Sequence, residues 1–595
     1  MNDLENLYEI LKDEAKKELE TGESVYENPL LKNAVNYMYG ILEFLVDDVK
    51  EGNVAEFDDE TKKIVQQFAQ WHTGLDMKTD MLDRDREIDI EYKKEVMQRA
   101  GKIFENKAIK EYLNSNLFYA THRIKKCGLH QKICKEIFEN IDNNNEIFVS
   151  VEWDTEEEAR LEEFFSGSEE HIKLEVVSAE ILAYDEYVFD RLEDPGVSGY
   201  IREIYRPYLV EYYVDVRELN QNQRLFLQRM YENRGWYKAA LTDEIDTDEG
   251  NIFGGTFIHS ASPVVYQGRK IKIIDSNVDE TTLNNIKKTY DTSSISCCKD
   301  ADIKKKLEEL FADVRFETTR VYKVGNGNCI YNYGKKGTKE TRFFYDIGFD
   351  MSAYIGKNPI KRSKNQYIKA LYSIGHMKPE CVILSHWDED HFRACVYANK
   401  AVFEKKWVAP YIYTSENKAN AKRLFLYLYK IGSLMVVQRG IARDIVVQHG
   451  AQRTMTLFVG KRQPGTDKKI TKCNCEGIAL YLENDTARYG KIKCLMQGDV
   501  PYMSLPQQTN FAKENPYTYL VAPHHGAEMD CSMLMGALKK DGQAVICCTN
   551  DTSKNRPEIN HLNALTKCYD KVECTETASH YIQFDLRKKK VMNIV

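Results

Sequence analysis

The most constraining feature of this chain is a series of four apolar, strand-like runs in its C-terminal half, each leading into a cluster of polar side chains. The runs are Cys381–Leu384, Ile492–Met496, Thr518–Val521 and Ala544–Cys548. Continuous apolar runs are typical of strands buried on both faces, and binding groups gather where such strands end. The pattern therefore predicts an α/β fold in which four separate segments contribute to one site.

The densest polar cluster follows the first of these runs and is typical of a metal site. Four side chains of ligand type lie within six residues: His386, Asp388, Asp390 and His391. A pair of metal ions about 3.5–4 Å apart needs more ligands than one structural ion, and a bridging carboxylate helps to hold the pair. Asp499, after the second run, is predicted to be that bridge, and His525, after the third, supplies another imidazole. Any one of these histidines alone is more often a surface or hydrogen-bonded core residue.

Five short motifs follow one another in the C-terminal part: VGNGNCI at 324–330, YDIG at 345–348, SHWDEDH at 385–391, GD at 498–499 and HHGA at 524–527. This order resembles the metallo-β-lactamase-fold hydrolases. Within them it most resembles the hydrolase domain of the bacterial competence DNA-uptake channel, whose pattern is VGxGxxxxI, IDxG, SHxDxDH, GD and HHGS. The resemblance covers about 280 residues, less than half of the chain. It implies a four-layer αββα sandwich over residues 315–595.

The resemblance also implies how the candidate ligands divide between two divalent ions. One ion would be held by His386 and Asp388, the other by Asp390, His391 and His525, with Asp499 bridging them. The segment PHHG resembles the superfamily's PGHG, which favours His525 over His524 as the ligand. Because the set mixes aspartate and histidine donors, zinc or manganese is expected.

Two further residues are expected close to the metal centre. Asp346 is predicted to brace the metal loop through hydrogen bonds rather than to bind metal itself. His561 follows the last strand, where related proteins often carry another active-site histidine. Asp390 and His561 are the candidate catalytic residues, and His561 would contact substrate or protonate a leaving group. A hydrogen-bonded loop histidine is the open alternative for His561.

The chain departs from the family pattern at several places. Asp388 stands where the superfamily's commonest HxHxDH form has its second histidine, as in the competence subgroup, and Ala527 replaces the usual serine. The superfamily's middle histidine ligand has no certain equivalent, and His449 is the one candidate for it. We therefore expect one of the two metal sites to be the weaker. No run approaches the roughly 18 apolar residues of a membrane span, so neither a DNA-uptake pore nor a membrane partner is expected.

The distribution of charge divides the chain into two unlike parts. Residues 1–314 carry 40 Lys and Arg against 66 Asp and Glu, a net charge of −26, whereas residues 315–595 carry 43 against 26, a net charge of +17. Such asymmetry points to a polyanionic partner such as nucleic acid. The alternative, that the two parts dock on each other or are merely solvated faces, explains it equally well. A basic hairpin is the candidate contact with a phosphate backbone, through Lys335, Lys336, Lys339 and Arg342. A solvated turn is the alternative for this segment.

The acidic N-terminal half carries no recognisable chemistry. Apolar residues at helical spacing, such as Leu4, Leu7 and Leu11, predict a helical region over residues 1–142. Short strand-like runs alternate with helical segments over residues 143–314 and predict an α+β region. This half is expected to bind a protein partner, to sense a signal or to mask the basic half. The 15 scattered cysteines and the acidic N-terminus without a signal-peptide pattern favour a reducing cytoplasm.

The favoured function is metal-dependent hydrolysis of phosphodiester bonds in DNA or RNA. A metal pair lowers the pKa of a bridging water toward neutrality and neutralises charge on the attacked phosphate. Two alternatives remain open: hydrolysis of a small ester, thioester, lactone or lactam, and a regulatory binding protein with a structural metal site. A sensor joined to a nuclease would also suit a defence or toxin effector, by analogy of architecture alone.

Overall fold

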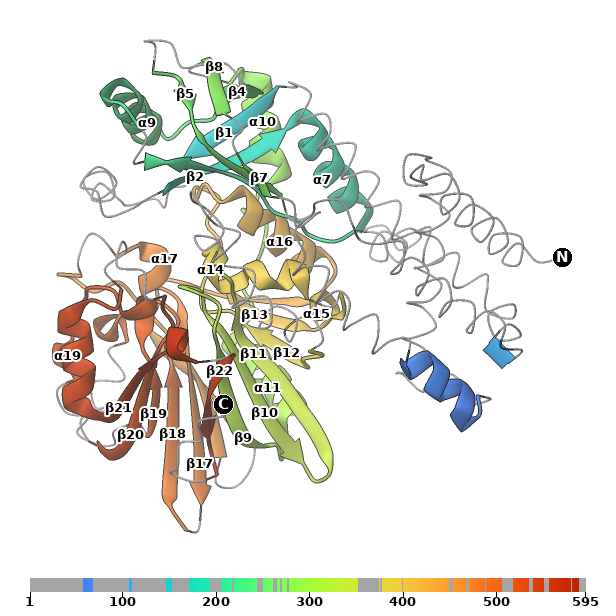
Figure 1. Ribbon diagram of the computed structural model, residues 1–595, viewed down its shortest axis with the longest axis vertical. Helices are drawn as coiled ribbons and strands as arrows, with labels where there is room; N and C mark the ends of the chain where they lie inside the picture. The colour runs from blue at the N-terminus through green and yellow to red at the C-terminus, as the bar shows by residue number, and fades with distance from the viewer. Residues whose placement is uncertain are drawn as a thin grey trace, which may run out of the picture. The chain divides into compact units, whose positions relative to one another are not determined.

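The chain was analysed as a computed structural model, shown in Figure 1, which has two compact units: Met1–Ile133 with Glu203–Tyr205, and Cys134–Arg202 with Arg206–Val595. The described residues are 57–67, 106, 108–109, 146–151, 171–192, 205–216, 219–242, 250–259, 265–267, 270–275, 278–350, 374, 377–398, 400–448, 453–466, 470–486, 488–505, 517–534, 539–549, 556–578 and 580–587. Residues 59–67 are helical, and most of the helical region predicted for residues 1–142 lies outside the described residues.

The first described sheet has eight strands and is antiparallel throughout. Its order is β5-β8-β4-β1-β2-β3-β6-β7. The strands are β1 (Ile147–Val151), β2 (His171–Ser178), β3 (Val210–Asp215), β4 (Tyr237–Thr242), β5 (Ile252–Phe253), β6 (Gly255–His259), β7 (Val265–Gln267) and β8 (Lys270–Asp275). Three helices accompany it: α7 (Ala179–Leu192), α9 (Gln221–Asn233) and α10 (Glu280–Thr289). We call this part the N-terminal module.

The second sheet has seven strands in the order β14-β13-β12-β11-β10-β9-β22. Its strands are β9 (Arg315–Tyr322), β10 (Cys329–Lys336), β11 (Lys339–Ile347), β12 (Cys381–Ile383), β13 (Lys406–Pro410), β14 (Leu434–Val437) and β22 (Tyr581–Asp585). Strands β11 to β14 run parallel, and β9, β10 and β22 pair antiparallel. The last described strand thus returns to the sheet that opens the C-terminal part.

The third sheet also has seven strands, in the order β15-β16-β17-β18-β19-β20-β21. Its strands are β15 (Arg443–Gln448), β16 (Arg453–Val459), β17 (Ile478–Thr486), β18 (Gly490–Met496), β19 (Tyr519–Val521), β20 (Lys539–Ile546) and β21 (Tyr569–Cys574). Strands β15 to β18 are antiparallel and β18 to β21 are parallel. Both seven-stranded sheets therefore join an antiparallel part to a parallel one.

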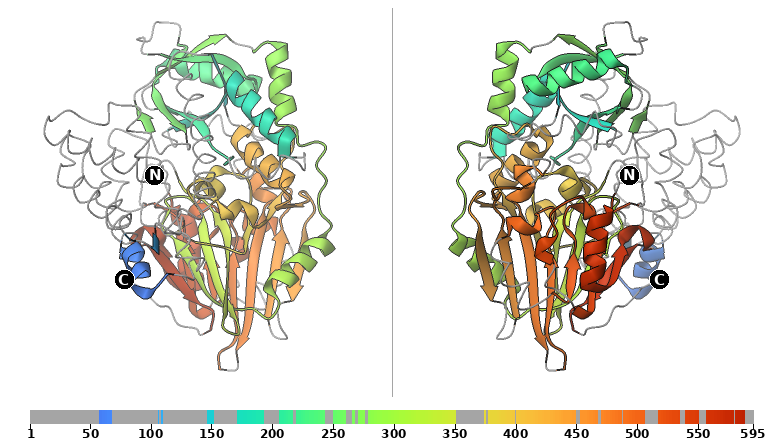
Figure 2. Two further views of the ribbon diagram at one scale, coloured as in Figure 1. Left: turned by 90° about the vertical axis from the view of Figure 1, so that its right-hand side faces the viewer. Right: turned by 90° about the vertical axis from the view of Figure 1, so that its left-hand side faces the viewer.

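The core lies between the two seven-stranded sheets and follows from the two-residue period of their strands. In β17, Leu480 and Leu482 face the shared core, whereas Tyr481 faces a second apolar layer on the outer side. That outer layer packs against α19 (Ile559–Cys568), which lies along the sheet in Figure 2. The four-layer α/β sandwich predicted from the sequence is confirmed.

Further helices complete the sandwich, and one of them precedes its expected start. Helix α11 (Asp300–Phe311) places Leu307 and Phe311 in the core between the sheets, so this core includes residues before position 315. The other helices of the described residues are α14 (Glu389–Phe392), η4 (Arg393–Tyr397), α15 (Ala401–Glu404), α16 (Ala419–Lys430), α17 (Lys472–Cys475), η5 (Tyr502–Ser504), η6 (Pro523–Gly526), η7 (Ser532–Leu534) and η9 (Thr575–Thr577). No helix in the described ranges has the length and hydropathy needed to cross a bilayer.

Buried ion pairs join the N-terminal module to the sandwich. Arg423 of α16 donates from Nε to Asp185 Oδ2 of α7 at 2.7 Å, and both side chains are fully buried. Arg393 pairs with Glu211 of β3 at 2.7 Å, and Lys173 of β2 pairs with Glu389 at 2.8 Å. Two of these pairs set acidic groups of the module against basic groups of the sandwich. Docking of the two parts therefore accounts for some of the charge asymmetry in the sequence.

Candidate metal centre

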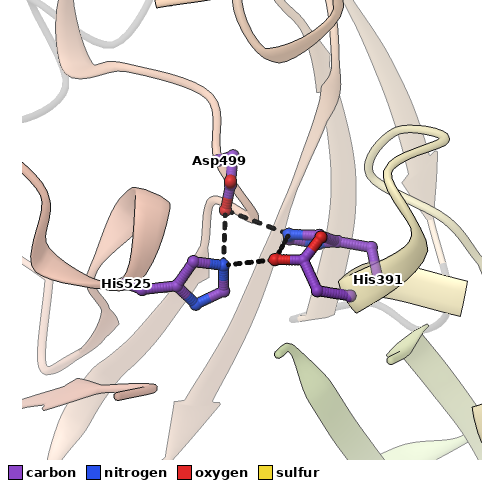
Figure 3. A group of neighbouring side chains, drawn as sticks. His391, Asp499 and His525 are labelled. Carbon is purple, nitrogen blue, oxygen red and sulfur yellow. Dashed lines mark hydrogen bonds and ion pairs between the residues drawn. The ribbon is translucent and has the colours of Figure 1, made fainter. Parts of the chain in front are cut away.

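Four of the predicted ligands converge where strands of both seven-stranded sheets end (Figure 3): Asp390, His391, Asp499 and His525. One ligand atom from each lies within 4.8 Å of every other. The two imidazoles approach one carboxylate oxygen, since Asp499 Oδ1 lies 3.1 Å from His391 Nε2 and 3.4 Å from His525 Nε2. Asp390 Oδ2 lies 3.0 Å from His525 Nε2. We call these four residues the first group.

The other oxygen of Asp499 faces a second, looser group formed by His386, Asp388 and His524. Asp499 Oδ2 lies 4.0 Å from His386 Nε2 and 3.7 Å from His524 Nε2. Asp388 Oδ2 in turn lies 3.1 Å from His386 Nε2. Asp499 therefore stands between two groups of donors, which is the position expected of a bridge. His524, the less favoured histidine of its pair, joins the second group.

The chemistry of the donors fits divalent cations. The Nε2 atoms of His386 and His391 and Oδ1 of Asp499 are buried and make no hydrogen bond of regular geometry with the described residues. Burial raises the pKa of Asp499, but the neighbouring imidazoles outweigh it and hold that pKa well below its usual range. Burial also raises the pKa of Asp390, but His391 and His525 outweigh this effect and lower that pKa to about 2. Ionised carboxylates beside buried nitrogen donors suit zinc or manganese.

Lys418 distinguishes the second group from the first. Its Nζ lies 2.5 Å from Asp388 Oδ1, so an ammonium already neutralises one of the carboxylates predicted to bind metal. Burial raises the pKa of Asp388, but Lys418 and His386 outweigh it and hold that pKa well below normal. The ammonium competes with a cation for Asp388, which is a physical reason to expect weaker binding in the second group. Lys418 lies 30 residues from its partner and carries no motif, so sequence reasoning missed it.

Hydrogen bonds behind the ligands fix which ring nitrogen faces the centre. Asp346 accepts from the Ser385 amide at 2.6 Å and lies 2.8 Å from His391 Nδ1. His525 Nδ1 lies 3.0 Å from the carbonyl oxygen of Cys547. Each Nδ1 donates to an oxygen, so each Nε2 faces the other ligands and is the nitrogen that would be available to a metal ion. Ser385, which the motif contained without a role, also contacts both His386 and His391 through its hydroxyl.

Asp346→Asn is expected to lower metal affinity about 10- to 100-fold, the usual effect of losing a carboxylate behind a histidine ligand. Asparagine keeps the shape and tolerates the left-handed backbone of position 346, where φ is 55°. Competition with a chromogenic chelator measures the affinity. Asp313→Asn is the matched control, since Asp313 also has a positive φ, of 60°, and lies at the far end of the sandwich. Equal affinities in the two variants would contradict the role of Asp346.

Two motif glycines allow the close packing of the metal loop. A Cβ on Gly348 would lie 1.7 Å from the carbonyl oxygen of Asp390, and one on Gly498 would lie 2.4 Å from the Ser385 Cβ. Gly498 also has a φ of 58°, which side chains disfavour. His524 and His525 hold the left-handed conformation as well, with φ values of 49° and 54°. Such backbone strain is concentrated at functional sites.

The hydrogen-bond partners of His561 lie outside the two donor groups. His561 is buried, with Nε2 3.1 Å from the Tyr502 hydroxyl and Nδ1 2.9 Å from the Ala527 carbonyl oxygen. These partners fit the alternative prediction of a hydrogen-bonded histidine rather than a catalytic one. Burial lowers the pKa of His561. His449 lies outside the described residues.

The basic hairpin occupies the opposite end of its strands from the metal centre. Cys329 pairs with Ile347 beside the centre, and Lys336 pairs with Lys339 at the tip. Seven residues at about 3.3 Å each put the tip about 23 Å from the centre. Lys336 also lies 3.8 Å from Asp313, and Arg342 pairs with Glu340. The structure therefore does not bring the hairpin cations, Lys335 included, together with the metal ligands.

Comparison with known proteins gives distant structural likenesses. No protein-family model and no curated protein matches the chain. CmlA, a diiron β-hydroxylase from Streptomyces venezuelae, is 10% identical, with a TM-score of 0.27, over 68% of this chain and 83% of its own. The metallo-β-lactamase fold protein YhfI from Bacillus subtilis is 12% identical, with a TM-score of 0.25, over 46% of this chain and 100% of its own.

A third solved structure, the metallo-β-lactamase MIM-1 from Novosphingobium pentaromativorans, is 10% identical, with a TM-score of 0.18. It matches over 36% of this chain and 78% of its own length. Because all three TM-scores lie below 0.5, no function is inferred from these likenesses, and the function is argued from the residues of the site.

Proposed function

We propose that the protein is a metal-dependent hydrolase of phosphodiester bonds, with DNA or RNA as its substrate class. The observation that supports it best is the position of Asp499, whose two oxygens face two separate groups of histidine and aspartate donors. A shared carboxylate of this kind suits a pair of divalent ions. The first group would hold one ion, and His386, Asp388 and His524 would hold the weaker one.

Two ions bound there would supply Lewis acidity, an activated water and neutralisation of charge on a phosphate. The residues themselves define the side from which a substrate approaches. Asp390 has 32% of its side chain exposed and Asp388 21%, whereas His386 and His391 are fully buried. Asp390 and Asp388 therefore line the open face. His561 takes no part in the proposed chemistry, because both of its ring nitrogens already have partners.

Three features favour a phosphodiester over a small ester. Three aspartates give the centre hard oxygen donors, which suit manganese as well as zinc. The motif order resembles a nuclease-type subgroup. The C-terminal part carries a net charge of +17, which favours a polyanion. The hairpin at Lys335 lies about 23 Å away by strand length, so its contact with substrate would require a polymer that spans this distance.

The alternative is hydrolysis of a small ester, thioester, lactone or lactam, because the same chemistry attacks carbonyl carbon. The exposed face at Asp390 would serve a small substrate equally well. The two functions differ in their response to salt. Binding of a nucleic-acid backbone weakens steeply as salt rises, because each neutralised phosphate releases counterions. Turnover of a neutral ester has no such dependence.

The test is a panel of Mn²⁺, Zn²⁺ and Mg²⁺ with single-stranded DNA, duplex DNA, RNA and a chromogenic ester, using the full chain. We expect metal-dependent cleavage of a nucleic acid and at least about a 10³-fold loss of rate in Asp390→Asn, because several kcal/mol of transition-state stabilisation depend on the ions. Asp485→Asn, on the hairpin between β17 and β18, is the matched control. Ester turnover without nucleic-acid cleavage would select the alternative, and inactivity with every metal would reject both.

A further inference from the structure

A cavity of about 460 Å³ lies between the N-terminal module and the loop that precedes α16. The module contributes Arg234 and Trp236, next to the end of α9, and Lys287 of α10. The sandwich contributes Glu416, Lys418 and Lys422. All of these residues belong to one compact unit of the chain. The volume is within the range of small-molecule sites, and none of the proposed metal ligands lines it.

The charges on the cavity wall leave a positive balance. Lys418 pairs with Asp388, and Glu416 pairs with Arg439, whose Nη1 lies 2.5 Å from Glu416 Oε1 and whose Nε lies 3.3 Å from Glu476. Three further cationic groups lie on the wall: Arg234, Lys287 and Lys422. Arg234 and Lys287 are exposed to solvent. An anion that entered the cavity would therefore meet cations from both sides of the junction.

Lys422 is the most informative of these groups because it is buried. Only 7% of the residue is exposed, and among the described residues its ammonium makes one hydrogen bond, to the Thr414 carbonyl oxygen at 2.7 Å. No described carboxylate lies within ion-pair distance of it, and burial lowers its pKa to about 8 although Glu416, Asp291 and Glu175 act in the opposite direction. A buried ammonium without a direct ion pair is costly, so a bound anion would stabilise it.

An aromatic surface accompanies the cations. Trp236 is half-buried on the cavity wall, and an indole face stacks on planar rings and on nucleobases. Cations beside a tryptophan match a ligand that carries both phosphate and a base. We propose that this cavity is a binding site for a nucleoside phosphate, distinct from the metal centre.

The cavity is connected to the metal centre through one short loop. Asn417 donates from Nδ2 to Ser150 Oγ of the module at 2.8 Å, and the next residue, Lys418, reaches Asp388. Lys418 therefore borders the cavity and also occupies the carboxylate of the second metal group. A phosphate in the cavity would compete for this ammonium and free Asp388 for a cation. The ligand and the metal would then strengthen each other's binding, as linkage requires.

Isothermal titration calorimetry on the full chain, freed of metal with EDTA, tests the site with AMP, ATP, inorganic phosphate and tripolyphosphate. Saturable binding of AMP or ATP is expected. Lys422→Met should weaken it at least about tenfold, as for loss of a charged hydrogen-bond partner. Lys430→Met, on the same helix but outside the cavity, is the matched control and should bind normally. Trp236→Leu should weaken ATP binding and leave tripolyphosphate binding unchanged.

The outcomes separate this inference from the proposed hydrolase, because binding is measured without metal or turnover. Absence of saturable binding by every nucleotide, or binding that Lys422→Met leaves intact, would overturn the site. Binding of phosphate with equal affinity and no gain from the base would overturn the nucleoside class. A second titration measures Mn²⁺ affinity with and without saturating AMP, and we expect at least about a threefold gain. An unchanged Mn²⁺ affinity would reject the connection through Lys418.

Discussion

Replacing Asp499 with asparagine is expected to reduce bound metal from two ions per chain to none and hydrolysis by at least about 10³-fold. Both oxygens of this carboxylate face donor groups, Oδ1 toward His391 and His525 and Oδ2 toward His386 and His524. An amide loses the negative charge and one of the two acceptor oxygens. One substitution therefore weakens both groups, whereas Asp388→Asn should remove only the weaker ion.

Elemental analysis of purified protein gives the metal count, and the cleavage assay gives the rate. Asp485→Asn, an aspartate near the far hairpin of the same sheet, should retain both metal and activity. Circular dichroism checks that the variants keep their secondary structure. An Asp499→Asn protein that retained two ions would show that the carboxylate does not bridge them. The assignment of the two groups would then have to be abandoned.

The sandwich was predicted from the resemblance of the motif order, and the candidate ligands from the pattern of strands and polar clusters. Strands buried on both faces have an unbroken apolar pattern, as in Cys381–Leu384, and the structure forms β12 at Cys381–Ile383. The polar residues after such strands are few, so the first group at His391, Asp499 and His525 was accessible to pattern reasoning. The glycine motifs belong to the same site, because a Cβ at Gly348 or Gly498 would clash with the loop that carries the ligands.

What the sequence did not predict depends on contacts between distant segments. Lys418 reaches Asp388 from a loop with no motif, and the buried Lys422 lines a cavity that residues of the N-terminal module also line. The basic hairpin was recognisable as charge, but its distance from the metal centre follows from strand length and register. The charge asymmetry had two open explanations, and pairs such as Arg393–Glu211 support docking of the two parts.

Arg423→Met is expected to destabilise the compact unit that contains both the module and the sandwich by about 3–5 kcal/mol, the usual cost of removing one partner from a buried ion pair. Arg423 donates to Asp185 Oδ2, the Tyr208 carbonyl oxygen and the Tyr290 hydroxyl. After the substitution Asp185 remains buried, with the Tyr208 and Tyr290 hydroxyls as donors. These two hydrogen bonds place the expected loss toward the lower end of the range.

Urea unfolding followed by intrinsic fluorescence measures the loss, with Lys430→Met as the control on the same helix. The double variant Asp185→Leu with Arg423→Met should recover much of the stability, since apolar pairs often replace buried ion pairs at little cost. An Arg423→Met variant as stable as the control would mean that the module and the sandwich are not held together by this pair. The C-terminal part would then be expected to fold without the module. The buried pair predicts instead that it unfolds or aggregates when the module is removed.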